Sequence, residues 1–219
     1  MKPVICLPEV EELFCELTTC YHDCLSLHQL SESLGRAVDA KDRVTYNHSE
    51  HVAVIGHLIS LAMGCSAKQA DIIHLAGHLH DIGKIGIPDV VLRKKDKFTD
   101  EDWKWMKRHP EIGAKIIAPV KVFKSKGSIR EILLHHHEKF DGSGYPSMLE
   151  GKDIPIGARI IAVADTLSAL IHDRPYRKGR SFEDAVEEIA KNSGTQFDPF
   201  VVKVFIGINA SIRQWLEGM

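Results

Sequence analysis

Histidines next to acidic residues are the part of this sequence best suited to chemistry. The chain has 219 residues, and 13 of them are histidines. His80 is followed directly by Asp81, and Lys84 comes three residues later. An adjacent His-Asp pair offers one neutral nitrogen ligand and one carboxylate that can bridge two cations. The sequence therefore indicates a metal centre built around this pair.

Further histidines and one aspartate are candidate partners for the pair. The adjacent His136 and His137 precede a glycine-rich turn, and Asp165 lies within a stretch that is apolar all round. Because a buried carboxylate without a partner is costly, Asp165 needs a cation. The candidate ligands are His48, His80, Asp81, His109, His136, His137 and Asp165.

Five imidazoles and two carboxylates are too many ligands for one tetrahedral ion. They suit two ions that share a bridging carboxylate, and the mixed donors favour Fe, Mn, Zn or Ni over Ca or Mg alone. Two ions ~3.5–4 Å apart form an arrangement that hydrolyses phosphate esters. In such a site Lys84 would hold a phosphate oxygen, while Arg174 and Arg177 would anchor a second phosphate.

Composition excludes several other classes of protein. Hydrophobic residues make up 44% of the chain and charged residues 26%, as in ordinary globular proteins. The net charge of −2 gives no polybasic signature, so we expect neither a DNA or RNA duplex nor a membrane as partner. There is no signal-peptide pattern, and the 5 cysteines do not form a disulfide framework. We therefore expect a cytoplasmic protein.

Apolar residues recur at helical spacing through most of the chain. Ser66 and Thr99 are expected helix caps, Gly35 and Gly64 expected stops, and Pro110 an expected helix start. The expected helices lie at about 9–34, 45–63, 66–81, 99–109, 110 onward, 128–137, 156–172, 181–191 and 198–215. No stretch alternates as a β-strand does, so the fold class is all-α.

Other histidines and cysteines are interpreted as structural. Cys20, Cys24 and His28 would share one helical face, but zinc sites usually join two short pairs across a turn. We interpret them as buried or interface side chains on a helix that pairs two copies or relays a signal. His74 and His78 fall off the helical face of His80 and are expected to be structural.

A set of motifs runs from about Asp42 to the last expected helix. They are His80-Asp81-Ile-Gly-Lys84, Lys107-Arg-His109-Pro, His136-His-Glu-Lys-Phe-Asp-Gly-Ser-Gly-Tyr-Pro146, Ala164-Asp165, Asp173-Arg-Pro-Tyr-Arg177 and Gly194-Thr-Gln-Phe-Asp-Pro199. Together they resemble the HD-GYP family of the HD superfamily. Members of this family are all-helical, metal-dependent phosphohydrolases that typically hydrolyse cyclic di-GMP, a bacterial second messenger, to linear pGpG and often on to GMP.

The resemblance implies an HD-superfamily helical bundle at 38–219. The apolar spacing before it predicts an N-terminal helical segment at 1–37, which would form a homodimer or bind signalling proteins. It assigns metal ligation to the seven candidate ligands, with Asp81 as the bridge. The two divalent ions would be Fe or Mn foremost, with Ni, Zn or Mg as alternatives. We expect one ion on His48, His80 and Asp165, and the other on His109, His136 and His137. Lys84, Arg174 and Arg177 would contact phosphates, and Gly144, Tyr145 and Pro146 would line the substrate pocket.

Two departures from the family pattern matter. Val44 stands where some members have a glutamate that helps to bind a third metal, so we expect two ions. Ser168 stands where the family usually has an aspartate, and loss of this carboxylate would weaken the interactions that support the metal ligands.

Two alternatives therefore stay open. One is a catalytically weak sensor or adaptor of cyclic dinucleotides, and the other is a hydrolase of a different cyclic dinucleotide such as cyclic GMP-AMP.

Overall fold

The computed structural model of the chain describes residues 21–42, 47–120, 127–173 and 178–218, with the backbone alone for 21–26. Within these ranges the chain is helical, and the only β-pairing is two isolated bridges, Asp141 with Glu150 and Ser193 with Phe197. The helices are α2 (Tyr21–Asp42), α3 (His48–Ala62), α4 (Ala67–Leu79), η1 (Ile82–Gly86), α5 (Asp89–Leu92), α6 (Asp100–Met106), α7 (His109–Ile116), α8 (Ile129–His135), η3 (Gly151–Asp153), α9 (Ile156–Ile171), α10 (Phe182–Lys191) and α11 (Pro199–Glu217). The expected all-α class is confirmed.

Most helix ends follow the signals in the sequence. Ser66 and Thr99 each form a capping box at the start of α4 and α6, and Gly64, with φ of 84°, follows α3. The helix of the His-Asp pair is shorter than expected, because α4 ends at Leu79 and the chain continues into the 3-10 helix η1. As a result, Asp81 lies between two helices.

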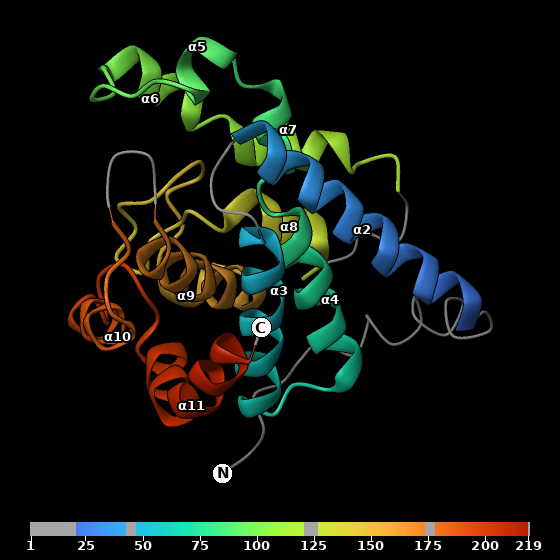
Figure 1. The fold of residues 1–219 in the computed structure, drawn as a ribbon, viewed down its shortest axis with the longest axis vertical. Coiled ribbons are helices and arrows are strands. Elements are labelled where there is room, and N and C mark those ends of the chain that lie inside the picture. The colour runs from blue at the N-terminus through green and yellow to red at the C-terminus, as the bar shows by residue number, and fades with distance from the viewer. Residues whose placement is uncertain (1–20, 43–46, 121–126, 174–177, 219) are drawn as a thin grey trace.

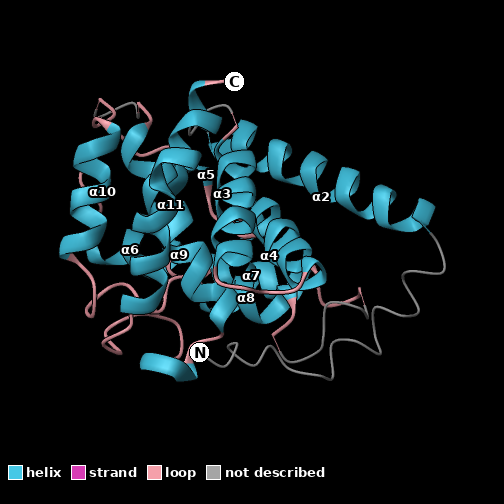
Figure 2. Cartoon of the chain, turned by 90° about the horizontal axis from the view of Figure 1, so that it is seen from below, coloured by secondary structure: helices cyan, strands magenta, loops and turns pink. Residues whose placement is uncertain are grey.

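The core of the bundle is formed by α3, α4 and α9 (Figure 1). As expected, α9 is buried on most of its surface, and Ile160, Ile161 and Leu167 have no exposed area. Helices α3 and α4 approach closely at Gly77, where a Cβ atom would lie 2.4 Å from the Ala53 Cα. The C-terminal helices α10 and α11 pack beside α9, while α5 and α6 form a smaller layer around their own apolar cluster (Figures 1 and 2).

Helix α2 lies along one side of the bundle and contacts α3, α4 and η1 (Figure 2). The prediction that Gly35 ends this helix is wrong, since α2 continues to Asp42. A Cβ atom at Gly35 would lie 2.6 Å from the carbonyl oxygen of His78, so glycine allows α2 to approach α4. The division between 1–37 and 38–219 falls within α2, and it stays a prediction. Residues 1–20 lie outside the described residues.

No helix among the described residues is long and apolar enough to cross a membrane.

Candidate metal centre

The His-Asp pair lies at the end of α4, in the interior of the protein. His80 Nδ1 is 2.7 Å from the carbonyl oxygen of Gly77 and donates to it, so Nε2 faces the site. This Nε2 is buried and has no hydrogen-bond partner among the described residues. Burial alone would lower the pKa of His80, but the carboxylates of Asp81 and Asp165 raise it to about 9. The site therefore favours a positive charge at this nitrogen, and a metal cation can supply it.

A first group of donors consists of His48, His80 and Asp165, whose ligand atoms all lie within 4.8 Å of one another. His48 comes from the first turn of α3, and its Nε2 is 3.2 Å from Asp165 Oδ1 on α9. Burial alone would raise the pKa of Asp165, but the hydrogen bond with His48 and the nearby His80 lower it well below its usual value. The carboxylate is therefore ionised and able to bind a cation.

A second group consists of His109, His136 and His137. His109 begins α7, and its Nε2 is 3.3 Å from His136 Nε2 and 3.1 Å from His137 Nε2 at the end of α8. Burial lowers the pKa of His109 to about 3 and also lowers that of His136 and His137. These imidazoles are neutral, and their lone pairs are available to a metal ion.

Asp81 lies between the two groups. Its Oδ2 atom is 3.3 Å from His80 Nε2, and its Oδ1 atom is 3.4 Å from His109 Nε2. Burial alone would raise the pKa of Asp81, but the positive charge of Lys84, followed by His80, lowers it well below its usual value. Each group of donors thus faces a different oxygen of one ionised carboxylate.

Lys84 is held beside Asp81 by a residue that sequence reasoning missed. Its Nζ atom is 2.8 Å from Asp81 Oδ2 and 2.7 Å from Asp42 Oδ2, at the end of α2. The preceding Lys41 donates from Nζ to the carbonyl oxygen of Ile85 at 2.7 Å, and it lies 3.3 Å from those of Lys84 and Ile87. The end of α2 therefore positions η1 and its lysine.

The loop containing Gly144, Tyr145 and Pro146 lies next to the second group. The Tyr145 ring stacks on His137 with 5.0 Å between centroids, and Lys107 Nζ is 5.5 Å from the Tyr145 centroid. A buried carboxylate holds the loop in place, because Glu138 Oε1 accepts a hydrogen bond of 2.7 Å from the Ser147 amide. Sequence reasoning assigned no role to Lys107 or to this hydrogen bond.

Ser168 occupies the position of the missing family aspartate. It is fully buried on α9, and its Oγ atom is 2.9 Å from His48 Nδ1. A hydroxyl is thus the partner of this imidazole. Arg174, Arg177 and Val44 lie outside the described residues.

The donor set fits divalent metal ions. Imidazole nitrogens and ionised carboxylate oxygens converge in two groups, and one carboxylate lies between them. This mixture suits the transition metals better than Ca or Mg, which take oxygen ligands.

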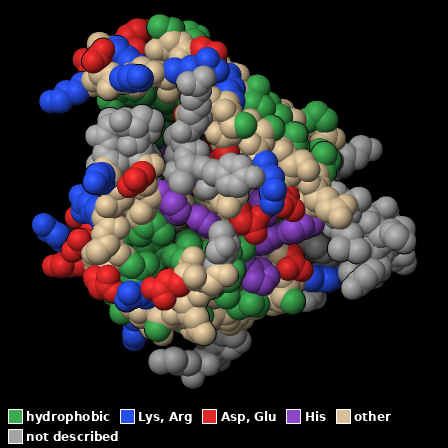
Figure 3. All heavy atoms as spheres, viewed as in Figure 1, with side chains coloured by type: hydrophobic (Ala, Val, Ile, Leu, Met, Phe, Trp, Pro, Cys, Tyr) green, Lys and Arg blue, Asp and Glu red, His purple; other side chains and the backbone are tan. Residues whose placement is uncertain are grey.

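Histidine side chains reach the surface near the middle of the face shown in Figure 3, next to hydrophobic and acidic side chains.

Comparisons with known proteins give relatives over most of the chain. The family model for the HD domain matches residues 29–201. A cyclic di-GMP phosphodiesterase of Thermotoga maritima is 38% identical over 206 residues, which cover 92% of this chain and 53% of that protein. A cyclic di-GMP phosphodiesterase of Vibrio cholerae is 43% identical over 80% of this chain and 38% of that protein. The 3'3'-cGAMP-specific phosphodiesterase 2 of Vibrio cholerae is 38% identical over 84% of this chain and 36% of that protein.

Solved structures share the fold at lower identity. A cyclic GMP-AMP specific phosphodiesterase of V. cholerae has a TM-score of 0.65 and 20% identity, over 87% of this chain and 49% of that one. A protein of Bdellovibrio bacteriovorus described as a HDG"Y"P protein has a TM-score of 0.63 and 20% identity, over 92% of this chain and 68% of that one.

The helical bundle and its buried histidine and aspartate groups define a class of protein. The chain belongs to the HD domain family, which implies the use of divalent metal ions. Within it, the motifs and the named relatives identify the chain as a member of the HD-GYP family. The chain spans about half or less of the length of the three curated relatives described above.

Proposed function

We propose that the chain is a metal-dependent phosphodiesterase that hydrolyses cyclic di-GMP to linear pGpG, and onward to GMP. The observation that carries the proposal is the position of Asp81, whose two oxygens face two separate groups of metal-binding side chains. Relatives that are named cyclic di-GMP phosphodiesterases support the choice of substrate. Because these relatives are longer, the activity of the whole protein is part of the proposal.

The proposed ligands are those expected from the sequence. His48, His80 and Asp165 would hold one ion, His109, His136 and His137 the other, and Asp81 would bridge them. The two ions, Fe or Mn foremost, would supply Lewis acidity to activate water and to stabilise charge on the phosphate. The hydrogen bonds to Nδ1 of His48, His80, His109 and His136 would leave the Nε2 atoms of these rings free to bind the ions.

Other side chains would bind the substrate. Lys84 uses its ammonium group to contact Asp42 and Asp81, and the remaining N–H would donate to a phosphate oxygen. Tyr145, stacked on His137, would shape the pocket together with Gly144 and Pro146. Arg174 and Arg177 would anchor the second phosphate, as the sequence predicts.

Specific observations favour two alternative functions. A relative named 3'3'-cGAMP-specific phosphodiesterase 2 favours cyclic GMP-AMP as substrate. Ser168, in place of the usual aspartate beside His48, favours a weakly active domain that senses a cyclic dinucleotide.

Product analysis tests the proposal. Protein purified without oxygen, with its metal content measured, would be incubated with cyclic di-GMP, and the products separated by chromatography. We expect pGpG or GMP from the native chain and none from Asp81→Ala. Binding of cyclic di-GMP without any product, despite two bound ions, would reject the enzyme in favour of the sensor. A parallel incubation with cyclic GMP-AMP distinguishes the substrates.

A further inference from the structure

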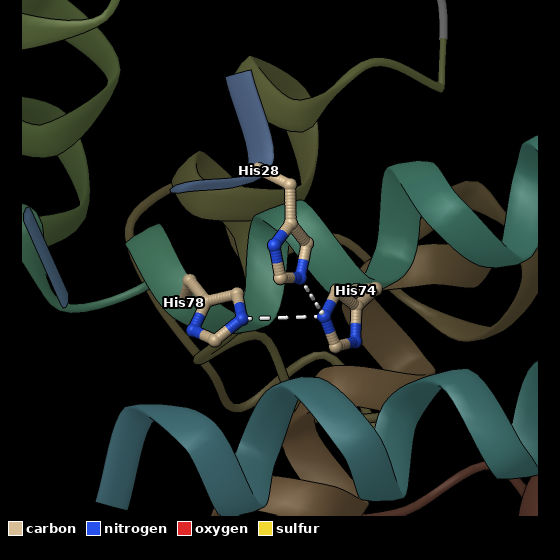
Figure 4. A group of neighbouring side chains, drawn as sticks. All are labelled: His28, His74 and His78. Carbon is tan, nitrogen blue, oxygen red and sulfur yellow. Dashed lines mark hydrogen bonds between the residues drawn. The ribbon is translucent and has the colours of Figure 1, made fainter. Parts of the chain in front are cut away.

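A third group of imidazoles lies outside the candidate metal centre. His28 on α2 meets His74 and His78 on α4, and the ring nitrogens of all three lie within 4.8 Å of one another (Figure 4). His74 Nε2 is 2.8 Å from His28 Nε2 and 3.2 Å from His78 Nε2. The spacing of His74 and His78 places both on one helical face, as in helices that offer two histidines to zinc. None of the three belongs to the other two groups.

Hydrogen bonding alone satisfies this arrangement poorly. In a neutral imidazole, Nε2 is either a donor or an acceptor, and an acceptor Nε2 has one lone pair. His74 Nε2 has two other Nε2 atoms within hydrogen-bonding distance. As an acceptor its one lone pair would have to serve both neighbours, and as a donor its one N–H would have to do so. A cation at the centre would instead take one lone pair from each ring.

The distances suit a transition metal. Zn–N bonds of about 2.0–2.1 Å at tetrahedral angles place ligand nitrogens about 3.3 Å apart. The corresponding distances from His109 Nε2 in the candidate metal centre are 3.1 and 3.3 Å. The values of 2.8 and 3.2 Å around His74 are similar, and all three ring nitrogens lie within 4.8 Å of one another. To accept an ion, His28 would move outward from His74.

A nearby carboxylate also favours a cation. The carboxylate of Glu50 has Oε2 3.9 Å from His78 Nε2. Glu32 on α2 is paired with Arg36 at 2.6 Å, so Glu50 is the carboxylate that would offset part of the charge of a divalent ion.

We propose that His28, His74 and His78 bind one divalent ion of the zinc type, separate from the dinuclear centre, and that this ion fastens α2 to α4. Three imidazoles favour Zn over Mg or Ca, and a water or Glu50 would complete four ligands. The contact of Gly35 with the His78 carbonyl brings the two helices together at the same place. The proposal reverses the expectation that these histidines have only a structural role. It does not depend on the proposed function.

Metal counting tests the site. The full chain would be stripped of metal, dialysed against a slight excess of Zn²⁺, and its zinc measured by mass spectrometry. We expect His28→Gln to bind one ion fewer than the native chain, and Gln29→Ala, an exposed neighbour, to bind the same number. The difference of one should persist in a His136→Ala background, in which the dinuclear centre is impaired. If the native chain and His28→Gln bound the same number of zinc ions, the proposal would be overturned. If zinc were lost in His136→Ala but not in His28→Gln, the third site would be rejected and the dinuclear centre would still be supported.

A second measurement needs no variant. Crystals of the native chain soaked in Zn²⁺ should give an anomalous peak between the three Nε2 atoms. A map with peaks at the dinuclear centre and none between these imidazoles would reject the third site.

Discussion

Four of the five proposed ligand histidines are held in place by two kinds of hydrogen bond. His80, His109 and His136 each donate from Nδ1 to the carbonyl oxygen three residues earlier in the chain, at 2.7, 2.8 and 2.7 Å respectively. A side-chain substitution does not remove these carbonyls. His48 depends instead on the Ser168 hydroxyl. The orientation of His48 is therefore the one most open to change by mutation.

We expect Ser168→Ala to weaken metal binding and turnover roughly 10–100-fold, because loss of such a partner frees the ligand ring. Ser168→Asp, which restores the family residue, should bind metal more tightly than the native chain. Metal affinity by competition with a chelator and the rate of cyclic di-GMP hydrolysis would both be measured.

The control for Ser168 is Ser60→Ala. Ser60 is also fully buried, but its Oγ donates to the His57 carbonyl within its own helix. This change should leave metal affinity unaltered. If Ser168→Ala behaved like the control, the hydroxyl would have no role in positioning His48.

At this scale, the sequence identified candidate ligands where residue types that are rarely found together occur in one motif. It missed contacts that are made by common residue types. The His-Asp pair and Asp165 were recognisable because a carboxylate in an apolar helix demands a partner. The structure brings all seven candidate ligands together in the expected groups. Asp42 was missed as a partner of Lys84, because the helix was expected to stop at Gly35, which left Asp42 in the stretch before the next helix. His74 and His78 were judged against His80 alone, so His28 was missed as their partner.

At the scale of elements, the end of α2 positions η1. Lys41 donates to carbonyl oxygens in and beside η1, while Asp42 contacts Lys84 itself. We expect Lys41→Met to lower turnover several-fold with little change in metal content, because Lys84 would lose its position but the ligands would not. Lys104→Met, an exposed lysine on α6, is the control. Steady-state kinetics with metal analysis would check this, and unchanged kinetics in Lys41→Met would contradict it.

The loop after α8 depends on Glu138. We expect Glu138→Ala to raise KM for cyclic di-GMP more than it lowers kcat, because the Ser147 amide would lose its acceptor and Tyr145 its fixed position. Glu131→Ala is the matched control, since Glu131 makes the same kind of bond to the Gly127 amide at the other end of α8. Equal KM values for the two variants would argue against this role.

Helix positions were more predictable than their ends and contacts. Capping boxes and apolar spacing are local, so the starts of α4 and α6 followed from the sequence. The end of α2 did not, because Gly35 is required by contact with α4 rather than by a turn. A glycine that is required by a contact between helices can thus be mistaken in the sequence for the end of a helix.

At the scale of the whole molecule, the candidate metal centre joins helices that are far apart in the sequence. Its donors come from α3, the end of α4, α7, the end of α8, and α9, so bound ions would cross-link the bundle. An ion that binds only the folded chain stabilises it by ~2.7 kcal/mol at a concentration 100 times Kd. For a chain of this size, that energy corresponds to a rise in Tm of about 5–10 °C.

We therefore expect a chelator to lower Tm by about this amount for each tightly held ion, and Mn²⁺ to restore it. The comparison that separates the sites uses two variants, His136→Ala and His28→Gln, melted with and without metal. Stabilisation by Mn²⁺ should be reduced in His136→Ala, because the cross-link between α7 and α8 is lost. In His28→Gln, the rise in Tm caused by Mn²⁺ should persist. Part of the rise in Tm caused by Zn²⁺ should be lost in that variant. If neither ion changed the Tm of the native chain, the buried donors would not hold metal tightly enough to join the helices.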